Sequence, residues 1–359
     1  MFNLFVGEIE KSVKKRTVIG ISVALTVLLI LIAIVFNLIV DLMKEAQNVL
    51  PDDFMSEITE VSPEEYQSDF YTTGYLSEQE LNDMITVVKQ NLTIIEEEYK
   101  KDKKTYYSDY YSEKSKLVVL EYAKDNGYYN KKVFIYGMNE SDTNKMAENF
   151  VGMYSAIIAT VLVIYGIILG AGMYVNEYKS GTIKLVMVRP ITKNRLTTAK
   201  LCSVYAILTA FFLVFVLVSF VYGAIAFGSN ASQKVLYSFN ATSAGVGTVG
   251  GFTFASIMIQ LFQILILSTI SFSLATITRK STIGIISSLV ILLGIGNFLS
   301  GLGINAFLLS DAMNLMNYFG VGKEVAPYGN FFVSLAVTVF WTAVSIVGVY
   351  VVTNKKDVI

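Results

Sequence analysis

The chain has 359 residues, of which 53% are hydrophobic and only 16% are charged, and its formal net charge is −1. This composition is typical of a protein with several membrane spans and excludes a chain that is soluble and globular as a whole. The absence of histidine excludes Ser-His and Cys-His nucleophilic catalysis and histidine metal sites, and the single cysteine, Cys202, cannot form an internal disulfide and is expected to be a packing residue.

The N-terminal segment, residues 1–16, is predicted to form a short amphipathic helix in the inner membrane interface. Its apolar residues keep helical spacing and share one face, while charged residues occupy the other; the apolar positions are Phe2, Phe5, Val6, Ile9 and Val13. A frayed terminus is the alternative. The apolar run that follows is too long for a signal peptide and has no small-residue cleavage site before Asp41, so we expect a retained first span.

Six apolar stretches are long enough to cross a membrane, because a spanning helix needs about 20 apolar residues for a hydrocarbon core of about 30 Å. We therefore predict an all-α polytopic membrane protein with six transmembrane helices, at residues 17–40, 149–175, 201–228, 252–275, 282–299 and 330–352. The fifth span is the shortest. The other segments are the connections 41–148, 176–200, 229–251, 276–281 and 300–329, the last of which could hold short re-entrant helices, and a tail at 353–359.

Segment 41–148 is predicted to be a small α or α+β extracytoplasmic domain. Ser77 and Glu80 have the spacing of a capping box, and helical periodicity continues to about Lys100. A second element, 113–125, is followed by Asn126-Gly127, which suits a helix C-cap, although its apolar centre could equally be a strand. Residues 133–136 read as a short strand.

Tyrosines are concentrated in the same segment, with a cluster at Tyr106, Tyr107, Tyr110 and Tyr111. Such a cluster could form a binding surface or pack within the domain. We favour packing.

Charge predicts the orientation of the chain. If the N-terminus lies in the cytoplasm, the inner segments carry fourteen basic residues against four acidic ones. Segment 41–148 is acidic, and long outer domains are exempt from the positive-inside rule. Both termini are therefore predicted to be cytoplasmic.

The predicted spans contain no Asp, Glu, Lys or Arg, which argues against an ion pump or a proton-coupled carrier. Milder polar residues follow helical stripes in the fourth and sixth spans; the candidates for lining a transport path are Gln260, Gln263, Ser271, Thr338 and Thr342. Helix packing through hydrogen bonds is the favoured reading, and path lining is the alternative. Gly166, Gly170 and Gly172 suggest a close helix contact in the second span.

The connection 176–200 is basic and contains a pattern that membrane topology alone does not require. Ser180 could cap a short helix over Thr182–Val188, Pro190 would end that helix, and Thr192 could cap the third span. No P-loop motif occurs, so any ATP hydrolysis must take place in a separate chain. A helix–proline–helix connection could transmit a rigid-body movement from such a partner, whereas a loop that only sets topology is the simpler alternative.

On these residues the chain resembles the permease subunits of the ABC-2 type transporter family. The family pattern is a glutamate, three residues, Gly-Thr, a short apolar helix, a proline and basic residues that enter the next span. This sequence matches it at Glu177, Gly181, Thr182, Leu185, Pro190, Arg195 and Lys200. The interfacial helix, the six spans and the large outer segment are also similar.

The resemblance implies that the connection forms a coupling helix that docks on an ATP-binding subunit. The implied coupling residues are Glu177, Tyr178, Ser180, Gly181, Thr182, Leu185, Arg189 and Pro190, with Arg279 and Lys280 as a second, smaller contact. The implied partners are two ATP-binding subunits, a second permease copy or paralogue, and the lipid bilayer, without nucleic acid. ATP and Mg²⁺ would bind to the partner, this chain would hold no cofactor or metal of its own, and the location would be a bacterial plasma membrane.

The leading hypothesis is therefore an ATP-driven exporter of amphipathic or lipophilic cargo, such as an antimicrobial peptide, a lipid or a drug. Na⁺ extrusion is one alternative, since hydroxyls and carbonyls can bind Na⁺. A membrane sensor that signals through the inner loop is another. An enzyme is the least expected class.

Overall fold

The computed structural model describes residues 2–13, 23, 27, 75–137, 147–181, 192–293, 308–323, 325 and 329–355. The chain divides into two units, Met1–Gln67 and Ser68–Ile359. In the first unit the expected N-terminal helix is present as α1, Phe2–Val13. The predicted first span, 17–40, lies outside the described residues except for Val23 and Val27.

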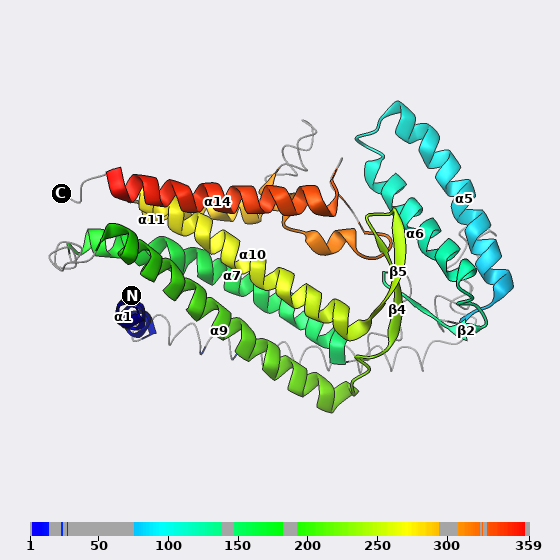
Figure 1. The fold of residues 1–359 in the computed structure, drawn as a ribbon, viewed down its shortest axis with the longest axis horizontal. Helices are drawn as coiled ribbons and strands as arrows, with labels where there is room; N and C mark the ends of the chain where they lie inside the picture. Colours follow the sequence, from blue (N-terminus) through cyan, green and yellow to red (C-terminus); the bar gives the residue numbers. More distant parts are fainter. Residues whose placement is uncertain are drawn as a thin grey trace. The chain divides into compact units, whose positions relative to one another are not determined.

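Four long helices form a bundle in the second unit; they are α7 (Ala147–Lys179), α9 (Lys193–Phe227), α10 (Val249–Thr278) and α14 (Phe331–Lys355). All four are long and apolar enough to cross a membrane, as the sequence predicts for these regions. Helix α10 is central and contacts α7, α9 and α14 (Figure 1).

A shorter helix, α11 (Ser281–Leu292), begins the predicted fifth span and packs on α10 and α7. Its 12 residues are too few to cross a bilayer by themselves. Residues 294–299 of that predicted span lie outside the described residues, so six spans remain a prediction.

Two glycines on α7 allow the neighbouring helices to approach closely. A Cβ at Gly170 would lie 2.6 Å from the carbonyl oxygen of Ser268 on α10, and one at Gly166 would lie 3.0 Å from a methyl group of Leu208 on α9. The predicted close contact is confirmed at these two positions. Gly172 differs, since a Cβ there would meet only the side chain of Asn176 in its own helix, at 3.0 Å.

An α/β domain adjoins one end of the bundle, and its two helices are α5 (Glu78–Lys101) and α6 (Tyr107–Asp125). The predicted capping box is confirmed: Ser77 Oγ accepts from the backbone N–H of Glu80 at 3.2 Å, and Glu80 Oε2 accepts from that of Ser77 at 3.1 Å. The second element is a helix rather than a strand. It ends before Gly127, whose φ is +66°.

The domain contains a three-stranded sheet whose strands come from two separate connections. Strand β3 (Phe134–Ile135) pairs in parallel with β4 (Lys234–Phe239), and β4 pairs antiparallel with β5 (Ser243–Thr248). Helix α6 packs against β4 and β5. A further short pair joins β1 (Tyr75–Leu76) to β2 (Lys131–Lys132).

A third connection also contributes to the domain. It contains two one-turn helices, α13 (Leu309–Ala312), which packs on α14 and α11 of the bundle, and the 3₁₀ helix η4 (Leu315–Tyr318), whose Tyr318 packs against Tyr111 of α6. The N–H of Gly320 donates to Ser238 O at 2.9 Å, and that of Val321 donates to Tyr136 O at 2.8 Å. The domain that the sequence placed within 41–148 therefore also draws on 229–251 and 300–329.

The tyrosine cluster lies within this domain and takes part in its packing. Tyr107 and Tyr111 stack with ring centroids 6.2 Å apart, and Tyr99 stacks on Tyr110 at 4.5 Å. The side chain of Tyr111 is buried against Tyr318. These contacts agree with packing, the favoured interpretation.

Candidate functional site

The described part of the predicted coupling connection consists of its two helical stems. Helix α7 ends at Lys179, and the described chain continues to Gly181. It resumes at Thr192, and α9 begins at Lys193. Four predicted coupling residues lie outside the described residues; they are Thr182, Leu185, Arg189 and Pro190. The site that can be described is therefore the base of the connection and the short turn between α10 and α11 beside it.

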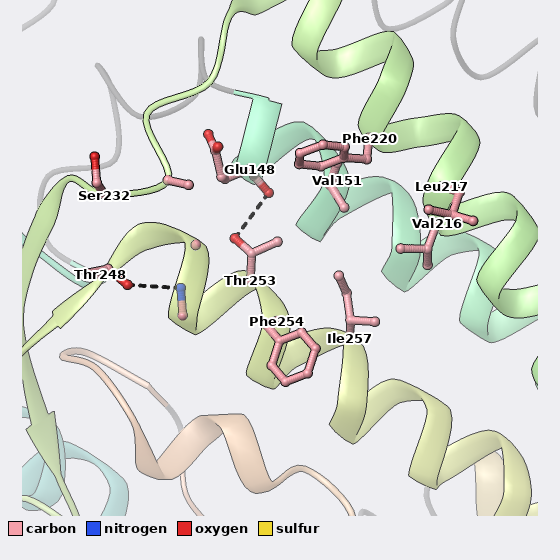
Figure 2. Close-up of a pocket in the computed structure, with 13 residues that line it drawn as sticks. Glu148, Val151, Val216, Leu217, Phe220, Ser232, Thr248, Thr253, Phe254 and Ile257 are labelled. Carbon is pink, nitrogen blue, oxygen red and sulfur yellow. Dashed lines mark hydrogen bonds between the residues drawn. The ribbon is translucent and has the colours of Figure 1, made fainter.

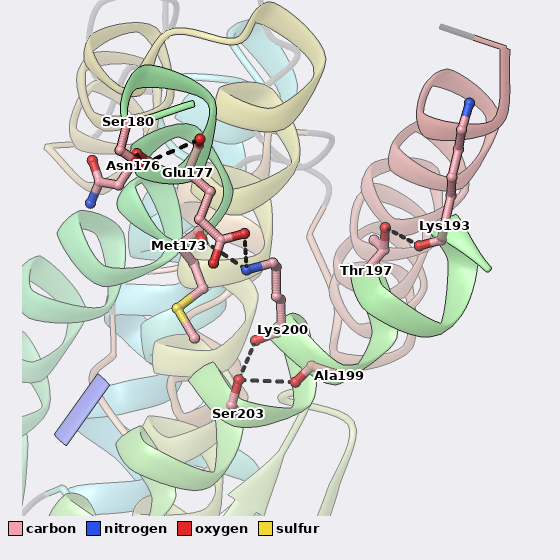
Figure 3. Close-up of polar contacts among 9 residues, drawn as sticks. All are labelled: Met173, Asn176, Glu177, Ser180, Lys193, Thr197, Ala199, Lys200 and Ser203. Carbon is pink, nitrogen blue, oxygen red and sulfur yellow. Dashed lines mark hydrogen bonds and ion pairs between the residues drawn. The ribbon is translucent and has the colours of Figure 1, made fainter. Parts of the chain in front are cut away.

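A buried ion pair joins the two stems. The Nζ of Lys200 lies 2.8 Å from Oε2 of Glu177, and the exposed fractions of the two residues are 0% and 4%. Lys200 also donates to the carbonyl oxygen of Met173 at 3.4 Å, one helical turn before Glu177 (Figure 3). We call this pair the Glu177–Lys200 clamp.

An aromatic ring completes the surroundings of the lysine. Nζ of Lys200 lies 5.6 Å from the ring centroid of Tyr174, which stacks at 5.4 Å on Tyr178. The ammonium group thus has a carboxylate, a carbonyl oxygen and a ring face around it. Removing one member of a buried ion pair costs about 3–5 kcal/mol, because the remaining charge loses its partner.

Helix α7 ends in a defined geometry at the start of the connection. The hydroxyl of Ser180 donates to Asn176 O at 2.8 Å, and the N–H of Gly181 donates to Tyr178 O at 3.2 Å. Gly181 has a φ of +70°, the left-handed conformation in which helices often end. The hydroxyl of Ser180 thus donates to α7, and its predicted role as the cap of a helix over Thr182–Val188 concerns residues outside those described.

Helix α9 extends the third predicted span well into the connection. It has 35 residues, so it is about 52 Å long and exceeds a hydrocarbon core of about 30 Å by several turns. Thr192 is its N-cap residue as predicted, although its side chain makes no capping hydrogen bond. The extra turns explain how Lys200 can be helical and charged at the edge of an apolar segment.

The short connection between α10 and α11 contacts the same stem. The guanidinium carbon of Arg279 lies 5.0 Å from the ring centroid of Tyr178, and Nζ of Lys179 lies 3.4 Å from Oγ of Ser281. Arg279 adopts a left-handed conformation, with φ of +57°, between α10 and α11. The structure therefore brings together Tyr178 and Arg279, while Lys280 is exposed beside them.

The candidate path residues mostly make hydrogen bonds that hold helices together. Gln263 Nε2 donates to Met313 O at 2.8 Å, Ser271 Oγ to Ile167 O at 2.7 Å, and Thr338 Oγ1 to Ala312 O at 3.3 Å. Thr342 and Gln260 bond within their own helices. These contacts support helix packing, and a role in lining a path stays a prediction.

Both members of the clamp, Glu177 and Lys200, are positions of the family pattern found in the sequence, but their pairing was not predicted. A signal was present, since Lys200 lies between Ala199 and Leu201 at the start of an apolar helix, where a buried lysine requires an anionic partner. Glu177 is the only acidic residue in the connection. Within the described residues, no three Cys, Asp or Glu side chains are grouped so that they could hold a metal ion.

Comparisons with known proteins were made for the whole chain. A family model described as ABC-2 family transporter protein matches residues 2–358. Neither a search of curated proteins nor a search of solved structures gave a match.

Proposed function

Because the chain belongs to the ABC-2 family of transporter proteins, and is thus a multi-pass membrane permease of an ABC transporter, we propose that its two clamped stems transmit movement from an ATP-binding subunit. Permeases of this family work with separate ATP-binding subunits. We place the contact with the ATP-binding subunit at residues 177–190, with Arg279 and Lys280 beside them.

The Glu177–Lys200 clamp is the observation that carries this proposal. A connection that served only topology would need basic residues, but it would not need its two ends joined by an ion pair that is almost fully buried. With the clamp in place, a force applied to the connection moves α7 and α9 together. The Arg279–Tyr178 contact links the same stem to the turn between α10 and α11.

We further propose that the chain is one half of an exporter for amphipathic or lipophilic cargo, paired with a second permease and two ATP-binding subunits. The absence of charged residues from the predicted spans favours cargo that is handled by apolar and hydroxyl surfaces. The basic inner segments favour cytoplasmic termini and an outer position for the α/β domain.

Gly181 offers a test of the coupling role that leaves the clamp intact. No atom of the described residues lies within 4 Å of a Cβ built at Gly181, so with respect to them a substitution there acts through the backbone conformation. Valine is strongly disfavoured at φ of +70°, whereas asparagine tolerates it. We expect Gly181→Val to lower the ATPase activity of the reconstituted complex about tenfold or more, and Gly181→Asn to stay close to wild type.

Gly127 provides a matched control, because it also has a positive φ, +66°, and no atom within 4 Å of a Cβ, but it lies in the α/β domain. Gly127→Val should leave the ATPase activity unchanged. Insertion and folding would be checked by size-exclusion chromatography. Full activity in a well-folded Gly181→Val complex would contradict the coupling proposal.

A further inference from the structure

A groove lies between α7, α9 and α10, at the end of the bundle next to the α/β domain. It has a volume of about 640 Å³, which is within the usual range for small-molecule sites. Its walls are apolar and are formed by Val151 of α7, Val216 and Phe220 of α9, and Phe254 and Ile257 of α10 (Figure 2).

The groove is bordered by exposed apolar side chains. Leu217 and Phe254 are each 63% exposed and Phe220 is 46% exposed, although all three belong to helices that can span a membrane. Exposed apolar side chains on such helices face lipid tails, which are as apolar as they are. A ligand would therefore reach this groove from the bilayer.

A buried carboxylate lies at the other end of the groove. Glu148 is 2% exposed, and its two oxygens accept hydrogen bonds from the hydroxyl of Ser229 and from the N–H of Asn230. In Figure 2 the carboxylate points away from Val151 and Phe220, toward the side on which Ser232 lies. No lysine or arginine of the described residues forms an ion pair with it.

The two donors account for the two oxygens of Glu148, one each, but neither donor is a cation that would balance the charge of the carboxylate. A buried charge is normally paired with an opposite one. The first turn of α7 favours an acidic residue only modestly. In surroundings of low dielectric constant, the field of an uncompensated carboxylate reaches several ångströms into the groove.

We propose that this groove binds a lipophilic cation, a molecule with one ammonium or phosphonium centre on a hydrocarbon body, which enters from the lipid phase. The hydrocarbon body contacts the walls formed by Val216, Phe254 and Ile257. The positive centre is held in the field of Glu148. A neutral lipid gains only the apolar contact, and an anion is repelled.

Binding of radiolabelled tetraphenylphosphonium to the full-length chain in phosphatidylcholine nanodiscs tests this proposal, with protein-free nanodiscs as the background. We expect saturable binding that Glu148→Gln weakens about tenfold, since glutamine keeps one of the two acceptor oxygens and removes the charge. Glu121→Gln removes an acidic residue on α6 that is paired with Lys89, and it should leave binding unchanged.

A second variant, Val216→Trp, fills the groove without touching the carboxylate and should also weaken binding about tenfold or more. This variant still tests whether the ligand occupies the groove if Glu148→Gln does not fold, as judged by circular dichroism and size-exclusion chromatography. Absence of saturable binding by the wild type would overturn the proposal, and this is the result expected if a second copy of the chain fills the groove. Equal binding by the wild type and both groove variants would overturn it too. The measurement needs no ATP-binding subunit, so its failure would leave the coupling proposal unaffected.

Discussion

Replacing Lys200 by methionine tests the clamp between α7 and α9 directly. Methionine keeps most of the length of the side chain but loses the ammonium group, which leaves the carboxylate of Glu177 buried without its partner. Neither side chain can reach water, since their exposed fractions are 0% and 4%. Breaking a buried pair in this way costs about 3–5 kcal/mol.

The same reasoning gives a different result for the double variant Glu177→Leu with Lys200→Met. Exchanging both members of a buried ion pair for apolar residues is often neutral or stabilising, because two desolvated charges disappear together. We therefore expect the double variant to recover most of the stability that Lys200→Met loses. Arg195→Met, an exposed change on the same helix, should alter stability by no more than about 0.5 kcal/mol.

The assay is the temperature at which half of the purified protein loses its monodisperse size-exclusion peak. At about 2 °C per kcal/mol, the value for large domains, Lys200→Met should lower this temperature by roughly 6–10 °C. A midpoint equal to wild type would refute the burial argument. A double variant as unstable as the single one would show that the ion pair stabilises the fold through more than its two charges.

Two further predictions concern the packing of the bundle and of the α/β domain. Gly170→Ala should lower the free energy of unfolding by about 1–3 kcal/mol, because the new Cβ would lie 2.6 Å from a backbone oxygen of α10. Gly172→Ala is the control, since its Cβ would meet only the flexible side chain of Asn176. Equal thermal midpoints for the two variants would contradict the close helix contact. Burial, together with the nearby Tyr318 and Tyr99, raises the pKa of Tyr107 to about 12. Since the folded state holds this proton more tightly than the unfolded state, the stabilising contribution is complete below about pH 10 and is lost as the pH rises toward about 12. The variant Tyr107→Phe should lose less stability than the wild type over that pH range, as measured by thermal unfolding followed by circular dichroism. An equal loss in both proteins would contradict the role of Tyr107.

Features set by neighbours along the chain could be predicted from the sequence. Four of the long apolar stretches are helices suited to span a membrane, and the capping box at Ser77 and the helix end at Gly127 appear where local residue preferences place them. The start of α9 was predicted from Thr192, its N-cap residue, whereas apolarity marks only the part of α9 that suits hydrocarbon. The helix also covers residues 193–200 because lysine, arginine and leucine all favour helix.

The hairpin of β4 and β5 was missed although its signals are local: the run Lys234–Phe239 is rich in residues that favour strands, and Asn240 suits a tight turn. Features that depend on residues far apart in the chain could not be predicted. The parallel pairing of β4 with β3 is one of them, because neither segment indicates its partner. The clamp was missed for the same reason, since two pattern positions become partners only when two helix ends meet.

The composite α/β domain also affects the order in which the chain can fold. Strand β4 follows its parallel partner β3 by roughly 100 residues, and Val321, a member of the same core, comes later still. Contacts between such distant segments carry a high loop-closure cost and form slowly. During synthesis, helices α5 and α6 must therefore wait with part of their apolar surface uncovered until α7, α9, α10 and α11 have all been made. The core of this domain can form completely only when nearly the entire chain is present. A folded α/β domain therefore requires that the helices between its segments have already been synthesised and placed.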